Sequence, residues 1–262
     1  MPPLKVGVQL ASLKQPLRKA LQTAARLGAD AVEIDARGEL RPATLTRTAL
    51  RQLRKTLDDL RLSVCAVTFR TRRGYNVSED LDRRIEATKA ALDFAYSLGA
   101  NVVVNQVGRV PEEATGPDWD MLLQSLSDIG RHGQHCGAVL AAETGSESGP
   151  TLASLIDALP EGSLFVSFDP GNLVVNDYSV DEALHALARH IQHVHAKDGV
   201  RDLAQGRGLE VPLGRGSVDF PSILAVLEQQ GYQGYFTIER GNAGDPVAEI
   251  GAAVSYLRQA LN

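Results

Sequence analysis

Four residues whose side chains can bind a metal ion or transfer a proton follow short apolar runs at near-regular intervals. They are Glu143, Asp169, His195 and Glu239, separated in turn by 26, 26 and 44 residues. Three carboxylates brought together would repel one another unless a cation lay among them. Carboxylate oxygens with a single imidazole suit a hard or borderline divalent ion, so the set predicts a site for Mn²⁺, Mg²⁺ or Co²⁺, with Zn²⁺ as a further candidate.

The elements that must position these residues are short strands alternating with helices. Eight runs rich in Val, Ile and Phe are expected as strands, at 5–10, 31–35, 62–69, 101–107, 138–143, 164–169, 191–195 and 235–239. Each precedes a segment with apolar residues at helical spacing, such as Leu50, Leu53 and Leu57. Eight such pairs predict an α/β fold, a closed (β/α)8 TIM barrel forming a single domain over residues 1–262. An open doubly wound sheet is the alternative, but the first turn, QLASLKQP, lacks a glycine-rich phosphate fingerprint.

A barrel of this kind gathers functional side chains at the carboxyl ends of its strands. The four residues above should therefore meet at one rim. Gln9, Glu33 and Asn105 also end strands, and we expect them to bind substrate hydroxyls. Basic residues in the following loops, Lys197 and Arg201 above all, indicate an anionic substrate or intermediate. The glycine-rich insert 197–218 is a candidate lid over the site.

Composition narrows the function further. The chain has 262 residues, is 44% hydrophobic and carries a formal net charge of -5, which does not favour nucleic-acid binding. No signal peptide or membrane-spanning run is apparent, so we expect a cytoplasmic protein with no membrane partner. The two cysteines, Cys65 and Cys136, suggest neither a disulfide framework nor a cysteine-based zinc site. Whether the chain forms a homo-oligomer is left open.

Four motifs carry a resemblance to a known family: ETG at 143–145, FDPGN at 168–172, HVHAKD at 193–198 and TIER at 237–240. Together they resemble the xylose isomerase-like superfamily of sugar phosphate isomerases and epimerases, which includes ketose 3-epimerases, hydroxypyruvate isomerase and inosose dehydratase. The resemblance implies that Glu143, Asp169, His195 and Glu239 bind one divalent metal ion. It also implies that Glu143 and Glu239 form an acid–base pair acting through an enediolate, and that Arg201 contacts the substrate.

One position departs from the epimerase pattern. Asn172 stands where those enzymes have a histidine; it can hydrogen-bond a substrate hydroxyl but cannot shuttle a proton near neutral pH. His193 shares a strand face with His195, and we expect it to support that residue without binding the metal.

The first hypothesis is a metal-dependent isomerase or epimerase of a sugar, a sugar phosphate or a related polyhydroxy carbonyl compound. The alternative is a lyase of the inosose or 3-dehydroshikimate dehydratase type, because dehydration can share the enediolate. A nuclease of the endonuclease IV type is disfavoured by the acidic balance and by the lack of histidine at the ends of the second to fourth strands. A non-catalytic sugar-binding barrel is the remaining alternative.

Overall fold

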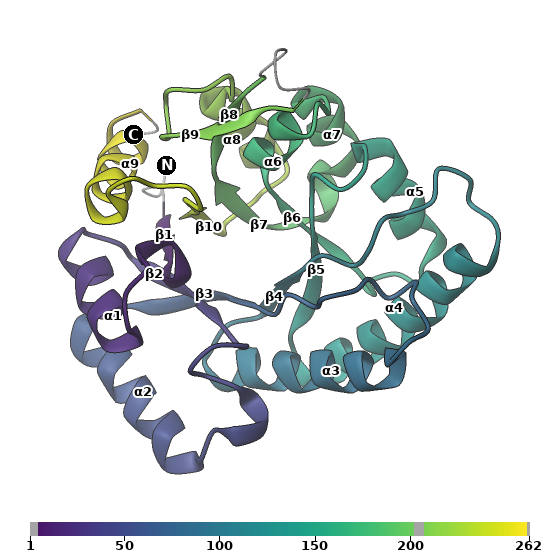
Figure 1. Ribbon diagram of the computed structural model, residues 1–262, viewed down its shortest axis with the longest axis horizontal. Helices are drawn as coiled ribbons and strands as arrows, with labels where there is room; N and C mark the ends of the chain where they lie inside the picture. The colour runs from purple at the N-terminus through teal and green to yellow at the C-terminus, as the bar shows by residue number, and fades with distance from the viewer. Residues whose placement is uncertain (1–4, 202–206, 261–262) are drawn as a thin grey trace.

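Eight parallel strands close into a barrel in the computed structural model, which describes residues 5–201 and 207–260 (Figure 1). Around the barrel the strand order is β1, β10, β7, β6, β5, β4, β3, β2. The strands are β1 (Lys5–Gln9), β2 (Ala31–Asp35), β3 (Ser63–Thr68), β4 (Val102–Asn105), β5 (Val139–Glu143), β6 (Phe165–Phe168), β7 (Ile191–Ala196) and β10 (Tyr235–Ile238). The predicted (β/α)8 barrel is confirmed, and each strand lies within one residue of an expected run or inside it. That residues 1–262 form one domain stays a prediction.

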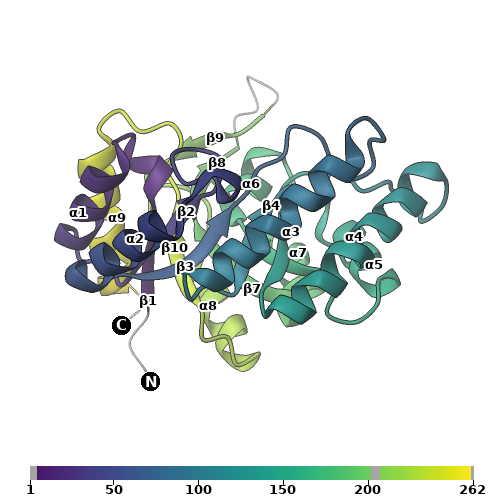
Figure 2. The same ribbon diagram turned by 90° about the horizontal axis from the view of Figure 1, so that it is seen from below.

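Helices surround the barrel on its outside (Figure 1, Figure 2). They are α1 (Leu17–Arg26), α2 (Arg47–Leu60), α3 (Leu81–Ser97), α4 (Pro117–Cys136), α5 (Gly149–Ala158), α6 (Pro170–Val175), α7 (Val180–Leu187), α8 (Phe220–Gln229) and α9 (Pro246–Ala260). Short 3-10 turns occur at Leu10–Leu13, Pro42–Thr44 and Ala188–His190. Over residues 5–201 and 207–260, none of the helices combines the length and the hydropathy that crossing a membrane requires.

The strands are short and apolar because both of their faces are buried. Val6 and Val8 of β1 are fully buried and belong to the core between the strands and the helices. Ile238 of β10, with 1% exposure, belongs to the same core. Closure of the barrel between β1 and β10 requires a close approach at Gly7. A Cβ there would lie 2.5 Å from Thr237 Oγ1, so a residue with a side chain would push the two strands apart.

The return from helix to strand also uses glycine. Gly137 ends α4 with φ of 84°, and the next backbone N–H, that of Ala138, donates to Gly133 O at 3.2 Å. The chain then enters β5 directly. Each helix carries the chain back along the outside of the barrel before the next strand, so the strands run parallel and their carboxyl ends lie at one rim.

The insert between β7 and α8 contains an antiparallel hairpin that the sequence did not predict. β8 (Asp198–Val200) pairs with β9 (Leu209–Val211). The buried carboxylate of Asp198 accepts hydrogen bonds from the backbone N–H groups of Gly199, Gly214, Gly216 and Val218. One carboxylate therefore fixes both ends of the described part of the candidate lid; residues 202–206 of that lid lie outside the described residues.

We predict that Asp198→Ala destabilises the protein by about 3 kcal/mol, because backbone donors are left without their acceptor in a buried place. Urea unfolding followed by circular dichroism measures the change. Asp59→Ala is the matched control: Asp59 forms an exposed pair with Lys55 on α2, and its loss should leave the unfolding midpoint nearly unchanged. Equal midpoints for both variants would contradict the role given to Asp198.

Candidate active site

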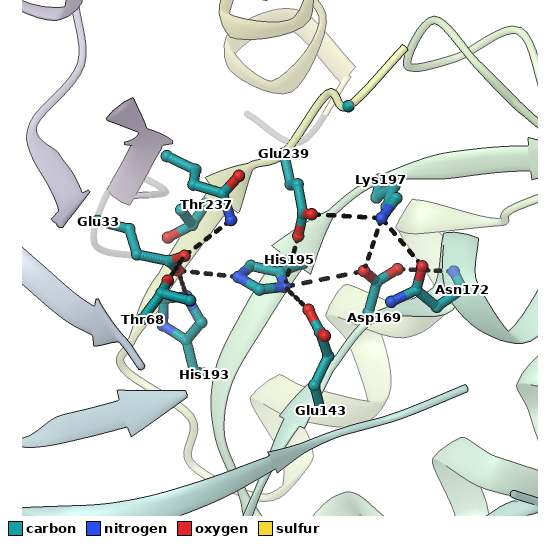
Figure 3. A network of polar contacts seen from close by, with 12 residues as sticks. Glu33, Thr68, Glu143, Asp169, Asn172, His193, His195, Lys197, Thr237 and Glu239 are labelled. Carbon is teal, nitrogen blue, oxygen red and sulfur yellow. Dashed lines mark hydrogen bonds and ion pairs between the residues drawn. The ribbon is translucent and has the colours of Figure 1, made fainter. Parts of the chain in front are cut away.

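Four polar side chains from consecutive strand ends converge on one point at the carboxyl rim of the barrel. Glu143 ends β5, Asp169 follows β6, His195 lies near the end of β7 and Glu239 follows β10. His195 Nδ1 is 3.1 Å from Glu239 Oε2, 3.2 Å from Glu143 Oε1 and 3.8 Å from Asp169 Oδ2. One ligand atom from each of the four lies within 4.8 Å of the others, and all four residues are buried (Figure 3).

Three of the facing atoms lack the hydrogen bonds that buried polar atoms ordinarily have. His195 Nδ1, Asp169 Oδ2 and Glu239 Oε2 are without a hydrogen-bond partner in the part of the chain that the structure describes. The other oxygen of Asp169 is engaged, since it accepts the N–H of Asn172 at 2.7 Å and caps α6. Asp169 thus uses one oxygen to begin a helix and directs the other into the cluster.

This set of atoms fits a divalent cation. Ligand atoms about 2.1 Å from a metal ion in octahedral geometry lie roughly 3 Å apart, which is close to the spacing around His195 Nδ1. Three carboxylates and one imidazole are the donors that suit Mn²⁺, Mg²⁺ or Co²⁺. A cation would also satisfy the unpartnered atoms and offset the repulsion among the carboxylates.

The orientation of the His195 ring is fixed from below by Glu33. His195 Nε2 lies 2.8 Å from Glu33 Oε2, and His193 Nε2 lies 2.9 Å from the same oxygen. Glu33 Oε1 accepts from Gln9 Nε2 at 2.9 Å and from the hydroxyl of Thr68. Because Nε2 carries the hydrogen shared with Glu33, Nδ1 is left to face the cluster, the arrangement typical of a histidine that binds metal.

The buried glutamates of this region differ in the direction in which their surroundings shift their pKa values. Burial alone would raise the pKa of Glu33, but His195 and His193 outweigh it and hold that pKa well below its usual value. Burial is likewise outweighed at Glu143, where His195 and Arg70 lower the pKa to about 2. At Glu239 burial prevails and raises the pKa. Glu143 is therefore the more firmly ionised glutamate and Glu239 the more easily protonated one.

Two cations, Lys197 and Arg70, flank the cluster. Lys197 Nζ is 3.4 Å from Glu239 Oε1 and 3.5 Å from Asp169 Oδ2, and burial is outweighed there by the carboxylates, which raise the pKa of Lys197. Arg70 Nη2 is 3.0 Å from Glu239 Oε1 and 3.4 Å from Glu143 Oε1. Arg70 was only one of several loop arginines in the sequence. Its place two residues beyond β3 was the signal that could have singled it out.

The polar residues predicted to bind substrate divide into two groups. Asn172 and Lys197 border the cluster, and Lys197 Nζ donates to Asn172 Oδ1 at 2.9 Å. Gln9, Glu33 and Asn105 are buried and already bonded to other protein groups. The expectation that these three meet substrate hydroxyls stays a prediction. In the described geometry, Gln9 bonds Glu33 and Glu33 orients His195.

Asn105 has a different structural task. Its amide donates to Tyr75 Oη at 2.7 Å and accepts the N–H of Thr71 at 3.1 Å. These bonds fix the loop that follows β3, which carries Arg70. The side-chain oxygen and the NH₂ group of Asn105 are both hydrogen-bonded to this loop, so Asn105 has a structural role here.

Arg201 is not brought to the cluster. Its half-exposed guanidinium pairs at 3.0 Å with Asp177, two residues beyond the end of α6. It directly precedes residues 202–206, which lie outside the described part of the chain. The expected contact between Arg201 and a substrate stays a prediction that the described geometry does not support.

An open cavity of about 400 Å³ adjoins the cluster. Gln106 and Asn172 line it, and Gln106 also donates to Glu143 Oε2 at 3.2 Å. The volume is in the range that a small substrate occupies. A larger cavity of about 540 Å³ lies at the opposite end of the barrel, beside the amino ends of β3, β7 and β10 and away from the strand ends that carry the four residues.

The closed barrel and the buried cluster at its carboxyl rim define a class, the TIM-barrel proteins whose site lies on the strand ends. Within it, the chain belongs to the xylose isomerase-like TIM barrel family, whose sequence model matches residues 21–260. The resemblance seen in the motifs is thereby confirmed.

The sequence identity to individual relatives is low. Inosose dehydratase of Geobacillus thermodenitrificans is 26% identical over 220 residues, 71% of this chain and 72% of that protein. The crystal structure of a xylose isomerase domain protein from Planctomyces limnophilus is 26% identical, with a TM-score of 0.84 and 98% of both chains covered. A xylose isomerase-like TIM barrel protein from Mycobacterium smegmatis, crystallised in complex with magnesium, is 18% identical, with a TM-score of 0.77 over 98% of this chain and 97% of that chain. This last similarity shows the fold alone.

We predict that Glu33→Gln weakens the binding of Mn²⁺ about 10- to 100-fold, because the amide cannot hold the His195 ring as the carboxylate does. Isothermal titration of the chelator-treated protein with Mn²⁺ measures the affinity. Glu79→Gln, at an exposed glutamate paired with Arg73, is the control and should bind Mn²⁺ like the unmodified protein. Unchanged affinity in a folded Glu33→Gln protein would contradict this role.

Proposed function

We propose that this protein is a divalent-metal-dependent lyase that removes water from a polyhydroxy ketone related to a sugar. The observation that carries the proposal is the convergence of Glu143, Asp169 and Glu239 on the unpartnered Nδ1 of His195. Such a site suits reactions that begin by removing a proton beside a carbonyl group, since the negative charge that develops needs a cation.

The four ligand residues would hold the metal ion, and its charge would stabilise the carbonyl oxygen of the substrate as that oxygen becomes negative. Glu239 and Glu143 lie on opposite sides of the His195 ring (Figure 3). One glutamate takes the proton from carbon, and the other is placed to act on the opposite face of the substrate. Arg70 touches both glutamates and supplies positive charge where substrate oxygens would lie.

Dehydration is favoured over isomerisation by two features. Asn172 cannot transfer protons as the histidine of the ketose 3-epimerases does, whereas its neighbour Lys197 can donate a proton to a departing hydroxyl group. The inosose dehydratases of Geobacillus thermodenitrificans and Clostridium beijerinckii are 26% and 24% identical to this chain over 220 and 218 residues. From the sequence alone, isomerisation was the first hypothesis and dehydration the alternative; these features together support dehydration as the proposal made here.

Isomerisation or epimerisation is the second candidate, because the opposed glutamates would serve it equally. To separate the two, the metal-loaded protein is incubated in D₂O with an inosose, 3-dehydroshikimate and a set of ketoses, and the products are followed by proton NMR. Loss of water supports the lyase, and exchange of a carbon-bound proton without loss of water supports the second candidate. No exchange and no loss of water with Mn²⁺, Mg²⁺ or Co²⁺ would contradict both.

We predict that Glu239→Gln lowers kcat by about 10³-fold while the fold is retained, because an amide cannot accept the substrate proton. Turnover is measured on the substrate found in the NMR experiment, and circular dichroism verifies the fold. Glu228→Gln, on the exposed face of α8, is the control and should keep full activity. Full activity in Glu239→Gln would rule out this residue as an acid or base.

We predict that Arg70→Met lowers kcat/KM about tenfold or more, since a charge-assisted contact worth at least about 1.5 kcal/mol is removed. Arg73→Met changes an arginine of the same loop that pairs with Glu79 at its exposed edge, and it should have little effect. The kinetic constants of both variants are compared at saturating Mn²⁺. Similar losses in both would show that the loop, and not the contact of Arg70 with the glutamates, matters.

A further inference from the structure

A second group of metal-binding side chains lies on the outside of the barrel, between α3 and α4. Asp93 of α3 meets His132 and Cys136 of α4, and one ligand atom from each lies within 4.8 Å of the other two. The two helices run side by side (Figure 2). Asp93 and His132 are 39 residues apart in sequence. The sequence therefore gave no sign that Cys136 and His132 would meet a carboxylate.

Helix geometry makes these donors a chelating set. His132 and Cys136 are four residues apart on α4, so their side chains lie on one face, one turn apart. The facing helix supplies the carboxylate, and His132 Nε2 is 2.9 Å from Asp93 Oδ1. Two ligands of a tetrahedral zinc ion, with bonds of 2.0–2.2 Å, lie roughly 3.3 Å apart. A metal ion could therefore replace the shared hydrogen with a small outward movement of the two side chains.

The local charge also favours a cation. Cys136 is the last residue of α4, and Asp93 lies one turn before the end of α3 at Ser97. The carbonyl ends of both helices therefore point toward the group, and each carries partial negative charge. Once the Cys136 thiol has released its proton to solvent, a carboxylate, a thiolate and a neutral imidazole balance the charge of one divalent ion.

This place is distinct from the candidate active site. α3 leads into the amino end of β4 and α4 into the amino end of β5, whereas Glu143 lies at the carboxyl end of β5. The donors differ as well, since the outer group includes a sulfur ligand and the inner one has oxygens and a single nitrogen. A soft ligand selects zinc or cobalt over magnesium.

We propose that Asp93, His132 and Cys136 form a second metal site, which binds Zn²⁺ or a similar thiophilic divalent ion with three protein ligands and joins α3 to α4. A fourth position is open to water because Asp93 and His132 are partly exposed. The ion would clasp two neighbouring helices that are otherwise held by packing and by ion pairs such as Lys89 with Asp128. The site does not depend on the function proposed for the barrel rim.

Cobalt provides the test, because a cobalt–thiolate bond gives a charge-transfer absorption in the near ultraviolet that oxygen and imidazole ligands do not give. The chelator-treated protein, residues 1–262, is titrated with Co²⁺ alone. We expect this absorption to saturate at one equivalent of sulfur-bound metal per chain and to disappear when Zn²⁺ is added. Failure of the absorption to appear would overturn the proposal.

Variants assign the absorption to its ligands. Cys136→Ser and His132→Gln should abolish it or shift its midpoint at least tenfold in Co²⁺ concentration, with unchanged circular dichroism. Cys65→Ser is the matched control at the other cysteine and should retain it, as should His195→Ala at the barrel rim. Absorption that survives Cys136→Ser, or that is lost with Cys65→Ser, would overturn the assignment.

A stability measurement gives a second readout in a background without the rim histidine. Zn²⁺ should raise the thermal midpoint of the His195→Ala protein, since an ion that binds only the folded chain stabilises it. It should not raise the midpoint of the protein that carries both His195→Ala and Cys136→Ser. Equal shifts in the two proteins would show that zinc acts elsewhere and would overturn the proposal.

Discussion

The ring of His195 lies between two sets of carboxylates, and each of its nitrogens serves one set. Nε2 shares a hydrogen with Glu33 below, and Nδ1 faces Glu143, Asp169 and Glu239 above. Burying these acids is costly unless each charge is compensated. Below the ring the compensation is complete, because two histidines and two polar side chains donate to Glu33. Above it the compensation is partial, and this difference gives the site its capacity to bind a cation.

Much of the surrounding polar structure follows from holding that ring. Gln9 and Thr68 donate to Glu33 Oε1, and His193 shares Glu33 Oε2 with His195. Asn105 fixes the loop from which Arg70 reaches the two glutamates. Gln9 and Asn105, which were expected to bind a substrate, are thus already bonded to other protein groups, whereas Asn172, Lys197 and Arg70 border the cluster.

A buried carboxylate whose charge is compensated also occurs at Asp198, where it has a structural role. Asp198 is as buried as the rim acids, but its oxygens accept backbone N–H groups, so it organises a loop and leaves no unpartnered atom for a ligand. Asp169 combines both uses, with one oxygen capping α6 and the other directed at His195. The partner that each carboxylate oxygen finds decides whether the residue is structural or available for chemistry.

By itself the sequence determined the barrel and the four residues that meet at its rim. Eight apolar runs alternating with helical segments favoured a closed barrel over an open doubly wound sheet. A closed parallel barrel brings its strand ends together, so the meeting of Glu143, Asp169, His195 and Glu239 could be predicted from their places at those ends. The tertiary structure decided what surrounds them. Whether Glu33 faces the pocket or the ring below depends on how neighbouring strands stagger, and whether Arg70 or Arg201 reaches the cluster depends on loop paths, which local sequence does not encode. The proximity of Asp93 to His132 and Cys136 likewise could not be predicted from the sequence, because it depends on how α3 packs against α4. Contacts between segments distant in sequence are fixed only by the packing of the whole chain.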